Sequence, residues 1–330
     1  MQSGKGSETL TTKDAVLALL EQNRGRYVSG PELAEKLSLS RTAVWKAMQS
    51  LGADGFEITA VKNKGYRLEN DHDRLSAAGI AACLPEPYQY NTVVFFGTTD
   101  STNTQARRLA LDGAAHGTVV VAAEQTAGRG RSGKSFFSPD SGLYLSIILK
   151  PPPGMADPQK ITIAAAVAVC RAIEAQTALS PKIKWVNDVY LDGKKVCGIL
   201  TEAVTDLESG GIDSIVVGVG VNCAIPAESI PPELVGIVGS LNATGLSRSR
   251  LAADITSGVL DAFDDLSAPA LIAEYRRRSF LYGKEICFQR NGETLTGTVT
   301  GIGDDGNLLV QLDGGESLSL SSGEVSISRL

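Results

Sequence analysis

The sequence predicts three structural parts in series: a winged helix-turn-helix domain, a larger domain of mixed α and β structure, and a small β-barrel. Three observations lead to this prediction. The first seventy residues show the pattern of three helices and a hairpin, the middle of the chain alternates apolar strand-like runs with helices, and the last fifty residues hold short strands separated by tight-turn pairs. A chain of 330 residues is long enough for such a series. We expect the domains at residues 1–70, 71–281 and 282–330.

The composition fits a globular protein that is not uniformly basic. Hydrophobic residues make up 43% and charged residues 21% of the chain, and the formal net charge is −6. Ten basic and eight acidic side chains lie in the first seventy residues, so this part carries a small positive excess within an acidic chain. The asymmetry indicates that the N-terminal part has a partner of its own, and it is compatible with a local face that binds nucleic acid.

The five cysteines are widely spaced without a CxxC pair, and the chain has only two histidines. This pattern predicts reduced, mostly buried thiols rather than a disulfide framework or a zinc site. The longest apolar run, residues 161–170, is well short of a membrane span. We therefore expect a soluble cytoplasmic protein that does not interact with membranes, and the pattern identifies no metal ligand.

Start signals and apolar spacing predict three helices before residue 70. The first covers residues 14–22, and the second follows Ser29, with Pro31 in its first turn and Glu32 in the position of a capping box. The third covers residues 41–51 and follows a short turn. Two short helices separated by about three residues describe a helix-turn-helix motif.

The outer face of the third helix is polar and basic, and the hairpin at residues 56–68 has a basic tip. A basic hairpin beside a recognition helix is the winged variant of the motif, and positive charge on these two elements suits the phosphates of DNA. The alternative is a small protein-interaction domain with a solvated charged face. We expect the DNA contacts to come from Arg41, Thr42, Trp45, Lys46, Lys62 and Lys64.

The middle and C-terminal regions differ in their patterns. After a charged run at residues 69–74, apolar strand-like runs are expected at 92–96, 118–123, 143–149, 182–184 and 214–221, and helices at 103–111, 158–179 and 250–266. In the C-terminal region, short strands at 284–289, 294–301, 307–312 and 316–320 are separated by Asn-Gly or Asp-Gly pairs, which favour tight hairpin turns. This last pattern predicts the small barrel.

A glycine-rich segment at residues 125–135 carries the most chemical information. Residues 128–135 satisfy GxxxxGK[ST] and residues 128–133 satisfy GxGxxG, but both patterns require a helix directly after the loop. The following residues 136–142 contain a proline and a glycine, and the next element alternates as a strand, so a P-loop NTPase and a Rossmann fold are weak alternatives. A loop with three glycines, two arginines and a lysine is expected to bind a polyanionic small molecule rather than to be a solvated hairpin.

A second group of polar residues lies at residues 184–202. Two strands appear there around a turn at Asp192 and Gly193, and the segment includes Trp185, Asn187, Asp188 and Lys195. Taken alone, these residues fit an ordinary hairpin.

Three segments together resemble the signature segments of the biotin-protein ligases: residues 100–103 (DSTN), 125–139 and 184–202. The winged helix is similar to that of the bifunctional members, which are also biotin operon repressors, and the resemblance covers nearly the whole chain. It implies an α/β (α+β) catalytic domain between an N-terminal winged helix-turn-helix and a C-terminal SH3-like β-barrel.

The resemblance also implies the reaction and the partners. Biotin and MgATP would form biotinyl-5'-AMP, and the biotinyl group would pass to a lysine of the biotin carboxyl carrier protein of acetyl-CoA carboxylase. The N-terminal domain would bind operator DNA of biotin genes, as a homodimer when the adenylate is bound. The alternatives are a DNA-binding small-molecule sensor without turnover and, less well supported, a P-loop NTPase.

Matching motif positions assigns roles to individual residues. Expected at biotin are Ser101, Thr102, Asn103, Gln125, Arg129, Gly130, Arg131 and Lys195; expected at ATP or the adenylate are Arg129, Arg131, Lys134, Asn187, Lys195 and Asn222. Arg131, Asp188 and Lys195 are the expected catalytic residues, with Asp188 orienting the incoming lysine or a magnesium ion. The chain departs from the family pattern where Ser132 and Lys134 replace basic residues, often arginine, Phe136 replaces a frequent tryptophan, and Val186 replaces a common proline.

Overall fold

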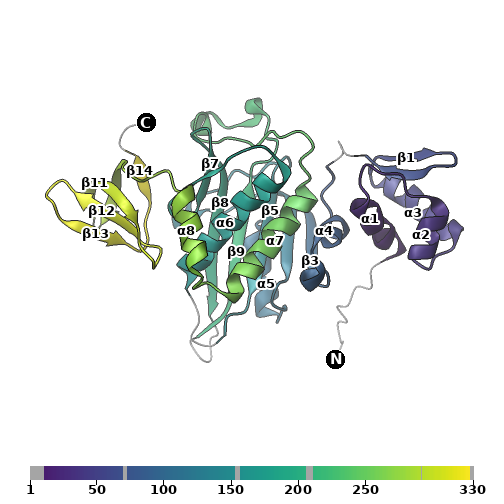
Figure 1. Ribbon diagram of the computed structural model, residues 1–330, viewed down its shortest axis with the longest axis horizontal. Helices are drawn as coiled ribbons and strands as arrows, with labels where there is room; N and C mark the ends of the chain where they lie inside the picture. The colour runs from purple at the N-terminus through teal and green to yellow at the C-terminus, as the bar shows by residue number, and fades with distance from the viewer. Residues whose placement is uncertain (1–10, 70–72, 153–156, 206–210, 291, 328–330) are drawn as a thin grey trace.

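The computed structural model describes residues 11–69, 73–152, 157–205, 211–290 and 292–327. Figure 1 shows three parts in chain order: a small helical domain with a hairpin, a central sheet covered by helices, and a small all-β domain on the far side of the sheet. The predicted order of the three parts is confirmed. The expected boundary between residues 70 and 71 lies outside the described residues.

The N-terminal domain is the predicted winged helix-turn-helix. Its elements are α1 (Thr12–Gln22), α2 (Gly30–Lys36), α3 (Arg41–Ala53), β1 (Ile58–Val61) and β2 (Gly65–Leu68). The side chains of Thr11, Ser29 and Ser40 each accept a hydrogen bond from the backbone N–H three residues later, which satisfies a free donor at the start of each helix. A small core of its own, which includes Leu20, Leu33 and Leu51, joins the three helices.

The central domain is built on one seven-stranded sheet with the order β3-β4-β5-β9-β8-β7-β6. Its strands are β3 (Val93–Thr99), β4 (Val119–Gln125), β5 (Leu143–Leu149), β6 (Lys182–Lys184), β7 (Asp188–Leu191), β8 (Lys194–Thr205) and β9 (Ile212–Val221). Only β3 and β4 run parallel; the other neighbours are antiparallel. The predicted turn at Asp192 and Gly193 joins β7 to β8, and both residues have the positive φ that a tight hairpin turn requires (49° and 77°).

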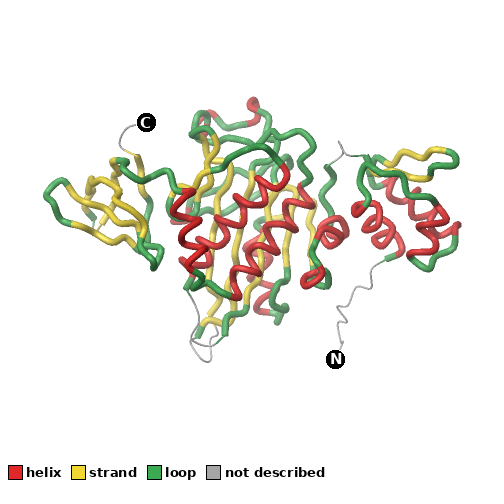
Figure 2. The backbone as a smooth tube through the Cα atoms, in the orientation of Figure 1, coloured by secondary structure: helices red, strands yellow, loops and turns green. Residues whose placement is uncertain are grey.

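Helices cover both faces of this sheet, and the side-chain alternation of the strands explains how (Figure 2). On one face, Val119 and Val121 belong to the main core together with α6 (Pro158–Gln176), α7 (Arg248–Asp264) and α8 (Pro269–Arg278). On the other face, Val120 packs in a smaller cluster with Ala106 of α5 (Thr102–Leu111). Successive side chains of a strand point to opposite faces, so one apolar strand serves both layers.

The remaining described helices of the central domain are short. They are α4 (Ala77–Cys83) and the 3-10 helices η1 (Glu86–Tyr88), η2 (Arg131–Gly133), η3 (Ala227–Ser229) and η4 (Pro232–Leu234). Ser76 caps α4, with its side chain accepting a hydrogen bond from the Gly79 backbone N–H. None of the five cysteines, all of which lie in described ranges, forms a disulfide, as predicted.

The C-terminal domain is an antiparallel five-stranded sheet with the order β13-β12-β11-β10-β14. Its strands are β10 (Glu285–Arg290), β11 (Glu293–Ile302), β12 (Leu308–Leu312), β13 (Ser317–Leu320) and β14 (Val325–Ile327). Four of them match the predicted strands, and β14 is additional. The domain is anchored to the central one by Trp185, whose indole N–H donates to the Gly306 carbonyl at 3.0 Å, and by Arg276, whose Nε donates to the Ile302 carbonyl at 2.7 Å.

Arg248, the first residue of α7, connects segments that are far apart in the chain. Its Nε donates to the Asp73 carboxylate at 2.6 Å, and its Nη1 donates to the carbonyls of Asp140 and Gly142 at 2.7 and 3.0 Å. Asp73 lies between the winged helix and the central domain, and the two carbonyls belong to the segment that leads from the glycine-rich loop into β5. The arginine thereby ties the start of the central domain to the neighbourhood of the loop.

Candidate functional site

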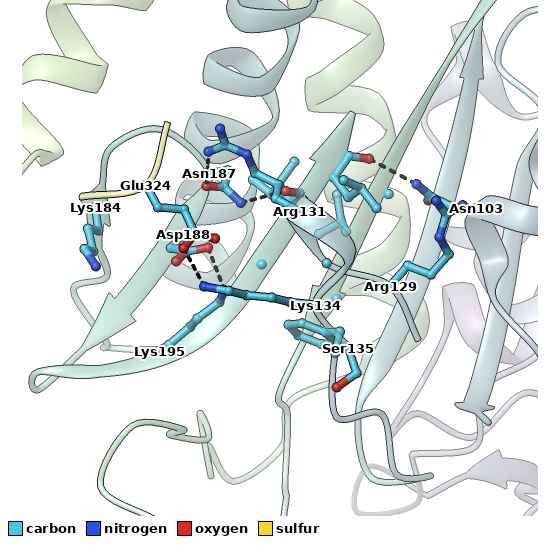
Figure 3. A pocket seen from close by; sticks show the side chains of 18 of the residues that line it. Asn103, Arg129, Arg131, Lys134, Ser135, Lys184, Asn187, Asp188, Lys195 and Glu324 are labelled. Carbon is cyan, nitrogen blue, oxygen red and sulfur yellow. Dashed lines mark hydrogen bonds and ion pairs between the residues drawn. The ribbon is translucent and has the colours of Figure 1, made fainter. Parts of the chain in front are cut away.

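A cavity of about 440 Å³ opens where the glycine-rich loop faces strands β7, β8 and β9 and the start of β14 (Figure 3). All but one of the predicted small-molecule-binding residues line it. They are Ser101, Thr102, Asn103, Gln125, Arg129, Gly130, Arg131, Lys134, Asn187, Asp188 and Lys195. The fold thus brings all three signature segments to one cavity.

One end of the cavity is formed by buried polar groups at the start of α5. Thr102 and Asn103 are only 4% exposed. The Thr102 backbone N–H donates to Gln125 Oε1 at 2.8 Å, and the hydroxyl of Ser146 lies 2.7 Å from Asn103 Oδ1. Because each of these groups has a protein partner, the end is preorganised, and its hydroxyl and amide groups suit a neutral polar guest.

Glycines on β8 and β9 make space for two side chains of the cavity wall. A Cβ atom at Gly218 would lie 2.0 Å from Asn103 Oδ1, and one at Gly220 would lie 2.5 Å from the Phe136 ring. Gly198 on β8 is similarly close to the same ring, at 2.9 Å. Phe136 therefore lies directly over bare backbone, where it forms an apolar wall.

The glycine-rich loop is a compact turn between two strands. The Gly130 N–H donates to the Lys134 carbonyl at 2.7 Å, and the turn passes through Ser132 and Gly133, whose φ angles are 54° and 74°. The loop contains only the three-residue turn η2 and leads through residues 134–142 into β5. The helix that a P-loop or a Rossmann fingerprint needs at this point is not there, as the sequence predicts.

Cationic and carboxylate groups face one another across the rest of the cavity (Figure 3). Arg131 Nη1 donates to Asn187 Oδ1 at 3.0 Å, and Asn187 Nδ2 donates to the Ile199 carbonyl at 2.9 Å. Lys195 Nζ lies 2.7 Å from Asp188 Oδ1 and 5.8 Å from the centre of the Phe136 ring. The wall is therefore rich in donors for an anion, and the Asp188 carboxylate lies close to the cations.

Lys184 is a cavity residue that the motif positions did not single out. It lines the wall beside Trp185, and burial lowers the pKa of its ammonium group, against the opposing influence of Asp188. Its place in the segment 184–202 was the available signal.

The C-terminal domain supplies a second set of lining residues that sequence reasoning missed. Residues 323–326 line the cavity, and Glu324 pairs with Lys134 of the glycine-rich loop. The hydrogen bond from Lys134 holds the pKa of the Glu324 carboxyl below its usual value. The two residues are 190 positions apart in the chain, so no local pattern could have revealed this contact.

Asn222 is the predicted residue that does not line the cavity. Its side chain is buried, and Nδ2 donates to the Gly239 carbonyl at 2.9 Å. The Gly239 N–H in turn donates to the Lys195 carbonyl at 2.8 Å. Asn222 directly follows the buried strand β9, and its amide holds the neighbouring loop beside Lys195.

The described residues contain no cluster of three or more histidine, cysteine, aspartate or glutamate side chains that could hold a metal ion. In the same ranges, no helix combines the length and the apolar character that crossing a bilayer requires.

A separate polar face lies on the N-terminal domain. Along α3, Val44, Met48 and Leu51 are buried, and Trp45 is 54% exposed. All six predicted DNA-contacting side chains are exposed: Arg41, Thr42, Trp45, Lys46, Lys62 and Lys64. They lie on the recognition helix and at the tip of the β1–β2 hairpin, as the winged helix-turn-helix pattern predicts.

Three family models match successive parts of the chain. A model described as HTH domain matches residues 12–67, one described as Biotin/lipoate A/B protein ligase family matches residues 95–222, and one described as Biotin protein ligase C terminal domain matches residues 282–328.

Similar proteins cover almost the whole chain. It is 33% identical to the bifunctional ligase/repressor BirA of Bacillus spizizenii, over 92% of this chain and 95% of that protein. It is 29% identical to the bifunctional ligase/repressor BirA of Escherichia coli, over 94% of this chain and 97% of that protein. Among solved structures, the biotin protein ligase from Aquifex aeolicus in complex with biotin and ATP is 26% identical, has a TM-score of 0.62, and is matched over 73% of this chain and 100% of that chain.

Proposed function

This chain belongs to the family of bifunctional biotin-protein ligases and repressors, and on that premise we propose how its residues divide the work. The protein is a biotin-protein ligase with an N-terminal DNA-binding domain. We propose that biotin and ATP meet in the cavity described above and form biotinyl-5'-AMP. The observation that carries the proposal is the convergence of a polar end, a cationic loop and a cationic hairpin on one cavity.

The first half-reaction joins two anions. A carboxylate oxygen of biotin forms a bond to the α-phosphorus of ATP, the bond from that phosphorus to the bridging oxygen breaks, and pyrophosphate leaves with the electron pair. Arg131, Lys134 and Lys195 offset the repulsion and stabilise the phosphoryl oxygens as charge develops. Each charge-assisted hydrogen bond contributes about 1.5 to 3 kcal/mol.

Biotin occupies the polar end in this proposal. The hydroxyl and amide groups of Ser101, Asn103 and Gln125 match the neutral ureido ring, which both donates and accepts hydrogen bonds. Thr102 supports them through its bond to Gln125. Arg129 and Gly130 of the loop cover biotin, Phe136 packs against an apolar part of the bound molecule, and Asn187 lies at the nucleotide.

The second half-reaction transfers the biotinyl group to a lysine of a biotin carboxyl carrier protein. The lysine nitrogen attacks the acyl carbon, the bond from that carbon to the phosphate oxygen breaks, AMP leaves, and the amine loses a proton. Asp188 orients the amine of the incoming lysine, since it is a carboxylate in the wall beside Lys195.

Magnesium fits this site as a companion of ATP. The ion keeps several waters and takes one or two carboxylates besides substrate phosphates, so it needs no cage of protein ligands. Asp188 and Glu324 are the carboxylates in the cavity wall that could hold it. When bound, the ion would supply charge neutralisation at the phosphates.

We also propose that α3 and the hairpin tip bind operator DNA of biotin genes, in a homodimer that forms when the adenylate is bound, and that the protein acts in the cytoplasm away from membranes. The exposed cations of these two elements support the DNA contact. A gel-shift titration with the promoter of the organism's biotin genes, with and without adenylate, tests it together with sedimentation of the same samples. A monomeric protein that gives no shift when loaded with adenylate would refute this part and leave the ligase part standing.

One assay tests the ligase assignment against its alternatives. Protein, biotin, ATP and a carrier domain are mixed, and biotin on the carrier is measured with AMP and pyrophosphate release. Labelled carrier is expected. ATP hydrolysis that does not depend on biotin would favour an NTPase, and biotin binding without turnover would favour a sensor.

A further inference from the structure

Glu202 on β8 lies next to the polar end of the cavity but does not belong to the predicted site. Its Oε1 lies 3.1 Å from Arg129 Nη2, and its Oε2 accepts hydrogen bonds from Asn103 Nδ2 at 2.9 Å and from Arg129 Nη1 at 3.4 Å. The carboxylate thus contacts the helix side and the loop side of the biotin end together. We propose that Glu202 is a positioning residue that holds Arg129 and Asn103 in their substrate-binding orientation, an inference that rests on the proposed function.

The alternation of β8 explains why Glu202 is at this place. Leu200, Glu202 and Val204 point to one face of the strand; Leu200 lines the cavity, and Val204 packs in the cluster under α5. Glu202 is therefore at the junction of the cavity wall and the apolar layer, where its side chain is only 16% exposed. Burying a carboxylate at such a junction costs desolvation free energy unless its oxygens have hydrogen-bond or ion-pair partners.

The geometry at Arg129 leaves donors for a substrate. Both Nη atoms of Arg129 face Glu202. Each Nη carries a second hydrogen, and the Nε–H is a further donor. The guanidinium is therefore held by Glu202 and still has N–H groups that can donate to a substrate. The Arg129 side chain is 45% exposed and belongs to a glycine-rich loop, so without an anchor it would have many accessible rotamers. Anchoring reduces the entropy lost when the substrate binds.

The charges around Glu202 indicate that it positions Arg129 and does not compete with biotin for this arginine. Arg107 of α5 also lies near Glu202, with Nη1 3.6 Å from Oε1, so two arginines share one carboxylate and a net positive charge remains. Asn103 holds the same carboxylate from the helix side. Glu202 therefore remains fixed on its strand while Arg129 keeps its attraction for the carboxylate of biotin.

The test is a thermodynamic cycle on biotin binding to the full-length protein. Glu202→Gln keeps an oxygen that can accept from Asn103 but removes the ion pair. We expect biotin to bind about tenfold more weakly, since one charge-assisted contact is lost, and ATP affinity to change within about twofold. In an Arg129→Ala background, Glu202→Gln is expected to have little additional effect, because the arginine it positions is gone and the glutamine oxygen can still accept from Asn103.

A structural role would not give this pattern. If Glu202→Gln weakened biotin binding by the same factor in both backgrounds, or left it unchanged or tighter, the proposal would be wrong. Glu202→Asp, which keeps the charge, is expected to bind biotin more tightly than Glu202→Gln, and it gives a second comparison if the glutamine variant unfolds. Glu124→Gln on β4, which removes a carboxylate outside the cavity wall, is the matched control and should bind biotin normally.

The same titrations separate this inference from the proposed function. Wild-type protein that binds biotin and labels a carrier supports the function whatever the variants do. Wild-type protein that binds no biotin would overturn both.

Discussion

At the scale of single residues, glycines shape the cavity as much as the residues with larger side chains do. Gly218 and Gly220 leave bare backbone on β9, and Asn103 and Phe136 occupy the space. The Phe136 side chain has no N–H to donate, so its contribution depends entirely on packing. Its packing therefore depends on the glycines beneath it.

We predict that Gly220→Ala impairs ligation. The added methyl would lie 2.5 Å from the Phe136 ring, so the ring must leave its place and the apolar wall is lost. The expected result is at least about a tenfold fall in kcat/KM for carrier biotinylation, comparable to the loss of one well-packed aromatic contact. The melting temperature should change little, since the cavity can take up the displaced ring.

The matched control is Gly97→Ala on β3, where an added Cβ meets nothing within 4 Å. Its activity should equal that of the unchanged protein. Equal activity of both variants would show that Phe136 does not need its present position.

Much of the residue-scale site could be predicted, because most of it lies in three local segments. Asn103, Gln125 and Lys195 were assigned from spacing and resemblance, and all three line the cavity. The burial of Asn222 could not be predicted, since it depends on the loop that returns through Gly239. Glu202 gave no signal as a single acidic residue on a strand, and its importance appears only when α5 and the glycine-rich loop meet it.

At the scale of elements, ion pairs join α6 to α8. Arg278 Nη1 lies 2.7 Å from Glu174 Oε1, and its Nη2 lies 2.8 Å from Glu274 Oε1. The Arg278 hydrogen bond lowers the pKa of Glu174, whereas for Glu274 burial alone would raise the pKa and the hydrogen bonds from Arg171 and Arg278 reverse this. Both folded pKa values lie below the ordinary 4.5, so this stabilisation is complete above that pH and is lost as the pH falls through the folded values.

We predict that Arg278→Met lowers the free energy of unfolding at pH 7 by about 2 to 3 kcal/mol, because it leaves Glu274 largely buried with fewer partners. The difference from the unchanged protein should shrink below pH 4.5, as the glutamates of the unchanged protein take up protons. Urea unfolding at several pH values measures both quantities. Arg277→Met, at a site that is 71% exposed, is the control and should change stability by less than about 1 kcal/mol. A constant difference across this pH range would contradict the explanation.

A second prediction at this scale concerns the recognition helix. Lys46→Ala should weaken operator binding and reduce the slope of log affinity against log salt by about one, because one phosphate contact is lost. Carrier biotinylation should be unaffected, since α3 does not contribute to the cavity. Lys160→Ala on α6 removes a positive charge from the central domain and serves as the control. A reduction of operator affinity with no change in slope would argue against a phosphate contact.

Sequence patterns predicted most of the long helices and the strands, and the exceptions include α8 and β14. Helix α8 has a proline in its first turn and three arginines in its last, signals that are weak beside the strong apolar periodicity of its neighbours. Strand β14 is three residues long and pairs with β10 across the whole C-terminal domain. Such a short strand exists only because of its partner, so local sequence does not specify it.

At the scale of the whole molecule, Arg248 connects the start of the central domain to the segment beside the glycine-rich loop. We predict that Arg248→Ala accelerates proteolysis at residues 73–75 severalfold, because Asp73 loses its anchor. Limited digestion followed by mass spectrometry measures the cleavage rate. Arg250→Ala removes a neighbouring arginine that pairs within α7 and should leave the rate unchanged. Equal rates in all three proteins would show that other contacts hold the segment.

The Lys134–Glu324 contact bears on the order in which the parts of the cavity are synthesised. Ribosomes synthesise a chain from its N-terminus, so the glycine-rich loop emerges long before the residue 190 positions later that pairs with it. Residues 323–326, which line one side of the cavity, are synthesised after all the strands of the seven-stranded sheet. A prematurely terminated chain that lacks them would therefore have a cavity without that side.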